Sequence, residues 1–419
     1  MEMSELSALL TRDGLALLDE VGEIASSAEV AKAVSRLRAA GHSPDLVSAV
    51  VGQAHLRVKA RSKFGEFAER MLFTRAGLEQ ATRLNVATLH AVRMRQAGIT
   101  AVTDLGCGIG GDSLAFAGAG LRVTAVDADA VTAAIAAYNL APFGEDAAVR
   151  QGLAEDAVSA SRGDVQLPRT DSADSSARSA QVRGERSAVW LDPARRTAGH
   201  SETRRLSASD WSPSPDWCFQ VAREHPTGIK LGPGLDRDLI PDDVEAQWVS
   251  ADGSVVELVL WSGALAREGI RRAALVVAGG QTHELTAAAD AEDVPVRTLG
   301  AFVHEPDGAV IRARLIGDAG RMLDAGMLDE RIAYLTGDKP VTSPFVQSFR
   351  VRDTMPAHPK AINSALRAND IGRLEIKKRG MDIDPAAFRK KLALQGSQEA
   401  TLILTRVGEK RIAILADRV

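Results

Sequence analysis

Apolar residues recur at helical spacing along the N-terminal part of the chain. Two such runs cover residues 6–18 and 28–41, and the second ends at a glycine. The Ser-Pro pair at 43–44 has the form of a helix cap followed by the first helical residue. Residues 66–98 fit either one broken helix or two short ones. The pattern therefore predicts an all-helical N-terminal domain over residues 1–98.

The pattern changes at residue 99, where short apolar runs begin to alternate with helix-like segments. Such alternation is typical of βαβ units, and it predicts a mostly parallel sheet. Residues 247–263 hold two alternating runs around Asp252-Gly253, which predicts an antiparallel hairpin at the edge of that sheet. We therefore expect an α/β domain over residues 99–294.

Two further segments complete the organisation. Residues 159–187 are rich in Ser, Arg and Asp and nearly lack large apolar side chains, so we expect a flexible insertion where a crossover helix would otherwise lie. Residues 295–419 alternate again and predict a small α+β domain. Within it, we read 297–315 as a hairpin around Asp307-Gly308 and 317–335 as one helix.

Composition narrows the class of protein. The chain has 419 residues, of which 45% are hydrophobic, and this is enough apolar material for sizeable cores and excludes a wholly disordered protein. The N-terminus does not resemble a signal peptide and no apolar run approaches 18 residues, so we expect a cytoplasmic protein without a membrane partner. Cys107 and Cys218 fit a reducing compartment. The His and Cys residues show no metal-ligand spacing, and we expect no metal.

A glycine-rich segment follows the first predicted strand and precedes a helix. Gly106-x-Gly108-x-x-Gly111 allows a tight turn and close approach of a ligand to the backbone. The spacing also matches a dinucleotide-binding fingerprint, and a plain strand-to-helix turn is a further alternative. Asp104, two residues before the first glycine, would repel a pyrophosphate. It favours a cationic ligand without phosphate, and S-adenosylmethionine, with its sulfonium and ammonium groups, has this chemistry.

Three more carboxylates follow predicted strands. Asp127 ends the second strand, where it is placed to accept both ribose hydroxyls, although it is also a candidate helix cap. Glu155 and Asp156 follow the third strand and are candidates for the adenine amino group, with a solvated turn as the alternative.

The second informative segment runs from an apolar strand into Asp192-Pro193. Ligands of open parallel sheets bind beyond the carboxyl ends of the strands, so we expect Asp192 and the glycine segment to share one cleft. The Asp192 carboxylate and the Pro193 carbonyl are both able to accept hydrogen bonds from an exocyclic amine and hold it against a methyl donor. A common Asp-Pro turn is the alternative.

These motifs resemble those of class I S-adenosylmethionine-dependent methyltransferases, and the layout is similar to bacterial members with a C-terminal THUMP-like domain. The resemblance implies a Rossmann-like sheet and S-adenosylmethionine as the cofactor. It assigns catalytic positions to Asp192, Pro193 and Arg195. The cofactor-binding positions it implies are Asp104, Gly106, Cys107, Gly108, Gly110, Asp112, Asp127, Ala128, Glu155 and Asp156.

THUMP modules bind RNA in enzymes that modify tRNA and rRNA, so the resemblance also implies an RNA substrate, with an exocyclic amine of a base favoured. Amino methyltransferases typically read Asn/Asp-Pro-Pro-aromatic, whereas Ala194 and Arg195 stand at the last two positions here. This departure leaves the target atom undetermined. Because the net charge is −4, an RNA-binding surface must be a local patch. Candidate substrate contacts are Arg196, Lys230, Lys377, Lys378 and Arg379, and a basic run at 57–63 is another candidate, although charge runs are usually solvated faces.

Two alternatives stay open. An NAD-dependent oxidoreductase fits the glycine spacing, but Asp104, the Asp-Pro strand and the lack of a plausible catalytic Tyr-x-x-x-Lys or His argue against it. A non-catalytic RNA-binding protein on a methyltransferase core fits the altered residues 194–195. The sequence leaves the oligomeric state undetermined.

Overall fold

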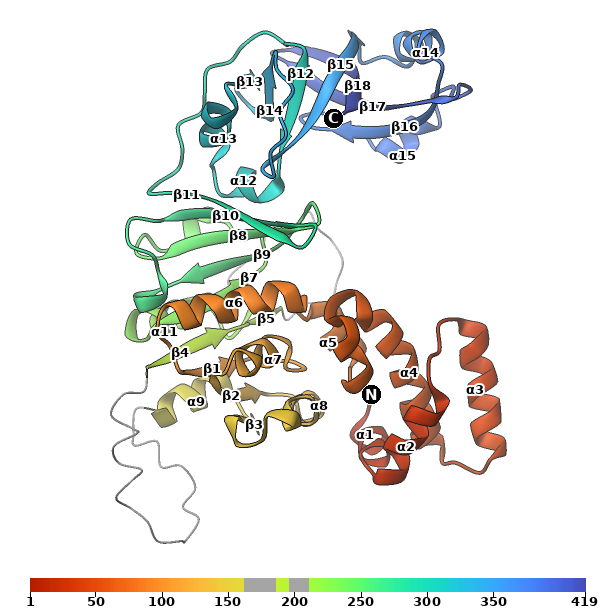
Figure 1. The fold of residues 1–419 in the computed structure, drawn as a ribbon, viewed down its shortest axis with the longest axis vertical. Coiled ribbons are helices and arrows are strands. Elements are labelled where there is room, and N and C mark those ends of the chain that lie inside the picture. Colours follow the sequence, from red (N-terminus) through yellow and green to blue (C-terminus); the bar gives the residue numbers. More distant parts are fainter. Residues whose placement is uncertain (162–185, 196–210) are drawn as a thin grey trace. The chain divides into compact units, whose positions relative to one another are not determined.

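The computed structural model describes residues 1–161, 186–195 and 211–419 (Figure 1). These residues form two compact units. The first contains Met1–Leu231, Asp236–Pro241 and Leu260–Ala266, and the second contains Gly232–Leu235, Asp242–Val259 and Arg267–Val419. Most of the predicted insertion at 159–187 lies outside the described residues. The three-domain division expected from the sequence is finer than these two units and stays a prediction.

The N-terminal residues form helices, as their apolar spacing predicts. The helices are α1 (Met3–Leu9), α2 (Arg12–Val21), α3 (Ser27–Ala39), α4 (Pro44–Phe64), α5 (Arg75–Gln80) and α6 (Leu84–Gln96), with a 3₁₀ turn, η1, at Gly65–Arg70. Ser43 caps α4 by accepting a hydrogen bond from the Leu46 amide, and Pro44 takes the first helical position. The apolar faces of these helices share one core, which also includes Ile109 and Ile135.

The first unit contains a parallel sheet. Its strands are β1 (Ala101–Leu105), β2 (Arg122–Asp127), β3 (Ala147–Gln151), β4 (Ser187–Leu191) and β7 (Thr227–Leu231), in the order β7-β4-β1-β2-β3. Helices α7 (Gly111–Gly118), α8 (Ala130–Leu140), α9 (Ala154–Ser161) and α11 (Pro215–Glu224) alternate with the strands along the chain (Figure 1). Two short strands, β5 (Ala194–Arg195) and β6 (Trp211–Ser212), pair with each other. The predicted α/β alternation is therefore confirmed, and the carboxyl ends of β1, β2 and β4 meet at one edge.

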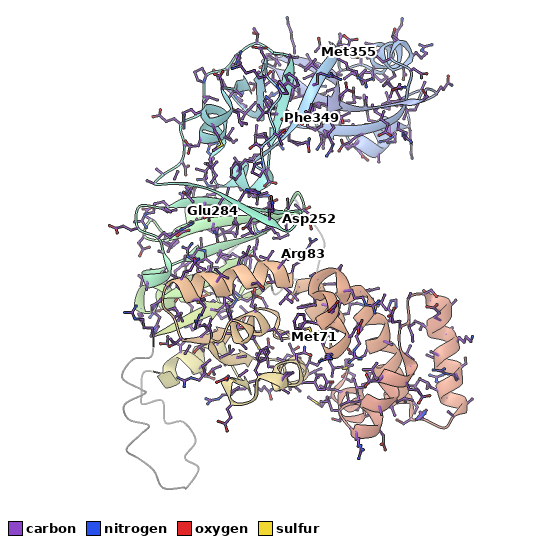
Figure 2. The ribbon with its side chains drawn as sticks, viewed as in Figure 1. Met71, Arg83, Asp252, Glu284, Phe349 and Met355 are labelled. Atoms are coloured by element: carbon purple, nitrogen blue, oxygen red, sulfur yellow. The ribbon has the colours of Figure 1, made fainter. Side chains whose placement is uncertain are left out.

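The hairpin predicted around Asp252-Gly253 is formed by β8 (Glu245–Ala251) and β9 (Ser254–Trp261). Both turn residues have positive φ, 51° and 79°, as a tight hairpin turn requires, and Asp252 is labelled in Figure 2. Two further strands extend this part of the sheet, since β10 (Arg272–Ala278) pairs in parallel with β8 and antiparallel with β11 (Gln281–Ala287). The edge strand is therefore β11. The hairpin of β8 and β9 does not lie at the edge, as the sequence predicted, because β10 and β11 lie beyond it.

The C-terminal part of the second unit is built on a seven-stranded mixed sheet. Its order is β13 (Gly326–Asp329), β14 (Ile332–Gly337), β12 (Phe302–Pro306), β15 (Val346–Pro356), β18 (Lys410–Arg418), β17 (Gln398–Val407) and β16 (Ile371–Lys378). Helices α12 (Gly308–Arg312), α13 (Ile316–Leu323), α14 (Pro359–Ala368) and α15 (Pro385–Arg389) connect the strands. This is the small α+β arrangement that the sequence predicts.

Two local predictions in this part are wrong. The segment 297–315 forms one strand and then a helix, because the Asp307 side chain caps α12 by accepting a hydrogen bond from the Ala309 amide at 2.8 Å. The segment 317–335 is not one helix. Asp324 adopts a left-handed conformation (φ 53°) that ends α13. The largely buried residues after it form β13, at the edge of the sheet, and β14 beside it.

Candidate functional site

The glycine segment between β1 and α7 folds as the sequence predicts. Gly106, Gly108 and Gly110 have positive φ values of 85°, 56° and 86°, which side chains disfavour. The amides of Gly106 and Cys107 both donate to the Val126 carbonyl, at 2.9 and 3.0 Å, so the segment turns across the end of β2. This turn leaves backbone close to the edge where a ligand of a parallel sheet binds.

Asp104 lies at the end of β1 with only 1% of its surface exposed. Its Oδ2 accepts a hydrogen bond from the Ser113 hydroxyl at 2.5 Å. Within the described part of the chain its buried Oδ1 has no hydrogen-bond partner. Burial, reinforced by the nearby carboxylates of Asp112 and Asp192, raises the pKa of Asp104 to about 8. A buried acceptor without a donor fits a ligand that brings a cationic or N–H group.

Asp127 ends β2 and contacts the same segment. Its Oδ2 accepts from the Gly108 amide and its Oδ1 from the Asp129 amide, each at 2.9 Å. Burial raises the pKa of Asp127. The cap of α8 is Asp129, whose side chain accepts from the Thr132 amide at 2.8 Å. Asp127 is therefore not the helix cap, and each of its oxygens retains a second lone pair for ligand hydroxyls.

The other candidate cofactor residues lie in α9, directly after β2 and in the glycine segment. Glu155 and Asp156 form the exposed first turn of α9, just after β3. Ala128 follows Asp127 directly and is exposed. Cys107 is 8% exposed, and burial raises the pKa of its thiol well above its ordinary value, so this cysteine is packed rather than reactive.

The Asp192-Pro193 segment meets the glycine segment. The Asp192 amide donates to the Leu105 carbonyl at 3.1 Å. A Cβ placed on Gly106 would lie 2.6 Å from the Asp192 carbonyl oxygen, so only glycine allows this approach. Pro193 is buried beside it. The structure thus places Asp104, Gly106 and Asp192 together. The backbone of Arg195 lies in β5. Arg196 lies outside the described residues.

Lys230 lies in strand β7, and its side chain connects several residues of this region. Its ammonium Nζ lies 2.5 Å from Asp192 Oδ2 and 3.1 Å from Asp112 Oδ2, and it donates to Thr82 Oγ1 at 2.8 Å. The side chain of Lys230 is 10% exposed. Asp112, a predicted cofactor position, therefore directs its carboxylate to a lysine of the protein itself.

His90 completes this polar cluster from helix α6. Its Nδ1 lies 3.0 Å from Asp112 Oδ1, and its ring packs 4.6 Å from the ring of Trp190. Although burial disfavours the charge of Asp112, the Lys230 ammonium and the His90 bond hold the pKa of this carboxyl well below its usual range. Sequence reasoning missed His90 and Thr82. The sequence offered one signal for His90, a single histidine on the apolar face of a predicted helix. This signal does not show which residue the histidine would contact.

The helical N-terminal residues contact the glycine segment through Asn139 of α8. The Asn139 side chain accepts from the Leu72 amide at 2.8 Å and donates to the carbonyls of Leu72 and Ile109 at 3.0 and 2.9 Å. Gln53 binds the Phe73 backbone in the same two-sided way, at 2.7 and 2.9 Å. The extended segment that begins at Met71, labelled in Figure 2, is therefore fixed on both sides.

Most of the basic run in α4 has partners inside the protein. Arg57 donates to the Met71 carbonyl at 3.0 Å, and Arg61 pairs with Glu23 and Glu69. Lys63 donates to three carbonyls at the end of α5, and burial together with the charge of Lys230 lowers its pKa to about 8. These contacts give the run a structural role.

The basic candidates of the second unit differ from one another. Lys377 pairs with Glu305 at 2.6 Å, and Arg379 pairs with the same carboxylate at 3.4 Å. Lys378 between them is exposed. Lys377 and Arg379 are thus committed to a partly buried ion pair, while Lys378 faces solvent.

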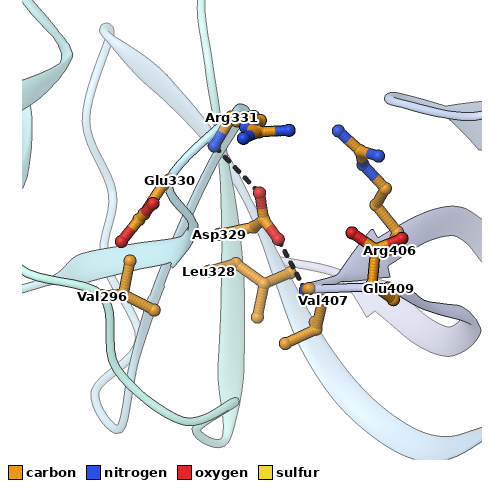
Figure 3. A pocket seen from close by; sticks show the side chains of 9 residues that line it. Val296, Leu328, Asp329, Glu330, Arg331, Arg406, Val407 and Glu409 are labelled. Atoms are coloured by element: carbon orange, nitrogen blue, oxygen red, sulfur yellow. Dashed lines mark hydrogen bonds between the residues drawn. The ribbon is translucent and has the colours of Figure 1, made fainter.

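A cleft of about 370 Å³ also lies in the second unit, between the turns at 328–331 and 406–409 (Figure 3). Asp329 joins the two turns, because its carboxylate accepts from the Arg331 amide at 2.9 Å and from the Gly408 amide at 2.7 Å. Acidic and basic side chains both line the cleft, so its charge favours neither an anionic nor a cationic ligand. In the described ranges, no group of three or more His, Cys, Asp or Glu is placed to hold a metal ion, and no described helix is long and apolar enough to cross a membrane.

The chain is similar to several known proteins. A family model described as THUMP domain-like matches residues 346–418, and a domain of unknown function (DUF8688) matches residues 2–60. Two uncharacterized S-adenosylmethionine-dependent methyltransferases, from the CDC 1551 and H37Rv strains of Mycobacterium tuberculosis, are each 32% identical over 381 residues, covering 89% of this chain and 95% of theirs. The crystal structure of a methyltransferase from Porphyromonas gingivalis W83 superposes with a TM-score of 0.68 at 17% identity, over 99% of this chain and 96% of that one, and shows the same fold.

Proposed function

Because the chain belongs to the S-adenosylmethionine-dependent methyltransferases, we propose that it methylates an exocyclic amine of a base in RNA, at the edge where β1, β2 and β4 end. The observation that carries this proposal is the contact of Gly106 with the Asp192 carbonyl. It joins the glycine segment, which has the form of a cofactor site, to the Asp-Pro segment, which has the form of an amine site.

The residues around the glycine segment fit the cofactor. Asp104 offers a buried oxygen without a donor to the ammonium group. Asp127 retains lone pairs for both ribose hydroxyls, and the exposed Glu155 and Asp156 are the candidates for the adenine amino group. In this assignment Gly106, Cys107, Gly108 and Gly110 supply backbone, and Ala128 lies beside the ribose.

Asp192 and Pro193 orient the substrate. Bound S-adenosylmethionine supplies an electrophilic methyl group at its sulfonium. The Asp192 carboxylate and the Pro193 carbonyl accept hydrogen bonds from the amine, so that its lone pair points at that methyl group. Alignment of two bound reactants alone lowers a barrier by roughly 7–11 kcal/mol. The catalytic work of this chain is then positioning, and no side chain forms a covalent bond to the substrate.

The assignment of RNA rests on the C-terminal residues. The match to a THUMP domain-like model at 346–418 supports RNA because THUMP modules bind RNA in tRNA- and rRNA-modifying enzymes. Lys378 offers a solvent-facing cation within this segment. Arg195, which stands where related amino methyltransferases carry an aromatic residue, is a candidate to stack on the base by its guanidinium plane.

The test is nucleoside mass spectrometry. RNA from a strain lacking the gene should lack one methylated nucleoside, and the purified protein with labelled S-adenosylmethionine should restore it. Asp192→Ala should abolish this transfer, whereas Asp146→Ala, which removes an exposed carboxylate outside the site, should not. If every methylated nucleoside persists in the deletion strain and its RNA accepts no label, RNA methylation is refuted.

A further inference from the structure

Lys230 connects three elements of the proposed methyl-transfer site. Its ammonium lies within hydrogen-bond distance of Asp192 after β4, Asp112 in α7 and Thr82 before α6. We propose that Lys230 is a positioning residue, which holds the Asp192 carboxylate in the orientation that receives the substrate amine. This inference rests on the proposed function, because it gives a role to Lys230 only if Asp192 binds that amine.

Lys230 is itself held by a rigid network. Thr82 Oγ1 accepts a hydrogen bond from Lys230 and donates one to Asp112 Oδ2 at 2.9 Å. The two groups that accept from Lys230, Thr82 and Asp112, are therefore also hydrogen-bonded to each other. His90 fixes the other oxygen of Asp112 at 3.0 Å. The His90 ring lies 4.6 Å from Trp190 and 6.1 Å from Trp261, both fully buried. The ammonium therefore has a position set by packed side chains and not by solvent.

Asp192 needs such a restraint. Its side chain is 34% exposed, while Lys230 and Asp112 are 10% and 7% exposed. A carboxylate at the mouth of a site rotates freely unless one oxygen is fixed, and misplacement of a reacting group by about 1 Å costs on the order of 100-fold in rate. The contact at 2.5 Å fixes Oδ2 of Asp192.

Charge supports the same role. The carboxylates of Asp104, Asp112 and Asp192 lie close enough to influence one another, and the Lys230 ammonium lies near all three. The positive charge of Lys230 also lowers the pKa of Lys63 in α4. Removal of Lys230 would leave two neighbouring carboxylates without this counter-ion, and a proton on Asp192 would then be favoured. A protonated Asp192 offers a donor where the amine needs an acceptor.

The test compares Lys230→Met and Lys230→Gln with the wild type in the full-length protein. Calorimetry with S-adenosylmethionine should give dissociation constants within about threefold of each other, which also shows that the variants fold. Methyl transfer to RNA from the deletion strain should fall about 100-fold in kcat for Lys230→Met. Lys230→Gln, which keeps a donor but no charge, should lose less, and the acidic limb of its pH–rate profile should move to higher pH. Lys32→Met, on the exposed surface of α3, is the matched control and should change nothing.

A double variant separates positioning from general stability. In an Asp192→Asn background, Lys230→Met should cause no more than about a twofold further loss, because the partner it holds is already altered. An equal kcat in wild type and Lys230→Met, or a full 100-fold loss that persists in the Asp192→Asn background, would overturn the inference while leaving the proposed function intact. Failure of the wild type to bind S-adenosylmethionine would overturn the proposed function and this inference with it.

Discussion

The carbonyl oxygen of Asp192 lies against the α-carbon of Gly106, so that a methyl group on residue 106 would come within 2.6 Å of it. The two residues directly follow adjacent parallel strands, β1 and β4, whose register pairs Leu105 with Leu191. Their contact joins the glycine segment, where we propose that the cofactor binds, to the Asp-Pro segment, where we propose that the substrate binds. It also explains why the first glycine of the segment cannot carry a side chain.

Gly106→Ala should therefore destabilise the protein by at least about 2 kcal/mol, because the backbone atoms it meets cannot move aside and its φ of 85° is left-handed. Gly108→Ala is the control, since φ there is also positive but no atom lies within 4 Å of the added carbon. It should cost about 1 kcal/mol. Urea denaturation checks both values, and equal losses in the two variants would contradict the close approach.

Asp104 should make stability depend on pH. Burial raises the pKa of Asp104 to about 8 in the folded protein, whereas it is near 4 in the unfolded chain. Between these values the folded state holds a proton that the unfolded state has released, so this group lowers stability as pH rises, by at most about 1.4 kcal/mol per pH unit. Asp104→Asn removes the titration. Denaturation from pH 5 to 8 should show the wild type losing stability relative to the variant, and parallel curves would count against this.

The same carboxyl should link cofactor binding to pH. A cationic ligand favours ionised Asp104, so the wild-type affinity for S-adenosylmethionine should rise with pH until about 8. The α-amino group of the ligand titrates in the same range, and the Asp104→Asn variant, which retains only that titration, is the reference. Calorimetry in two buffers of different ionisation enthalpy should detect proton release by the wild type in excess of the variant. Equal proton release by both proteins would exclude the link.

Asn139 should couple the helical N-terminal residues to the glycine segment. Asn139→Ala leaves the Leu72 amide and the carbonyls of Leu72 and Ile109 without this buried partner, and we expect a loss of about 2–3 kcal/mol in the free energy of unfolding. The affinity for S-adenosylmethionine should fall with it. Asn85→Ala, at an exposed position, should change stability by less than about 0.5 kcal/mol. A similar small change for Asn139→Ala would mean that this contact does not fix the segment.

Adjacent lysines of the C-terminal segment should behave differently. Lys377→Met breaks the pair with Glu305 and should cost about 1.5 kcal/mol of stability. Lys378→Met should leave stability unchanged but reduce RNA affinity, with the slope of log K against log salt smaller by about one. Filter binding over a salt series measures this. An unchanged slope would remove Lys378 from the RNA surface.

Local signals predicted much of the fold. The helical N-terminus, the alternating α/β segment and the hairpin at Asp252-Gly253 each depend on spacing or turn chemistry within a few residues. The hairpin expected over 297–315 failed because Asp307-Gly308 serves as a helix start as readily as a turn. The helix expected over 317–335 failed because the burial of β13 and β14 in the sheet outweighs a local helical pattern.

In the candidate site too, the sequence predicted contiguous motifs but not contacts between distant residues. The glycine segment and Asp192-Pro193 are contiguous motifs, so a role for each can be predicted from the sequence alone. Family membership confirms S-adenosylmethionine as the cofactor and excludes the NAD-dependent alternative. The cluster of Thr82, His90, Asp112 and Lys230 joins residues up to 148 positions apart. No periodic pattern encodes such contacts, because they depend on how three elements pack.

Titration calorimetry of the wild-type protein with S-adenosylmethionine tests the central claim most directly. One molecule should bind per chain, and Asp127→Ala should weaken binding at least about tenfold, because each hydrogen bond to a charged group contributes about 1.5–3 kcal/mol. Absence of binding by the wild type, or an unchanged dissociation constant in Asp127→Ala, would contradict the assignment of this edge of the sheet as the cofactor site.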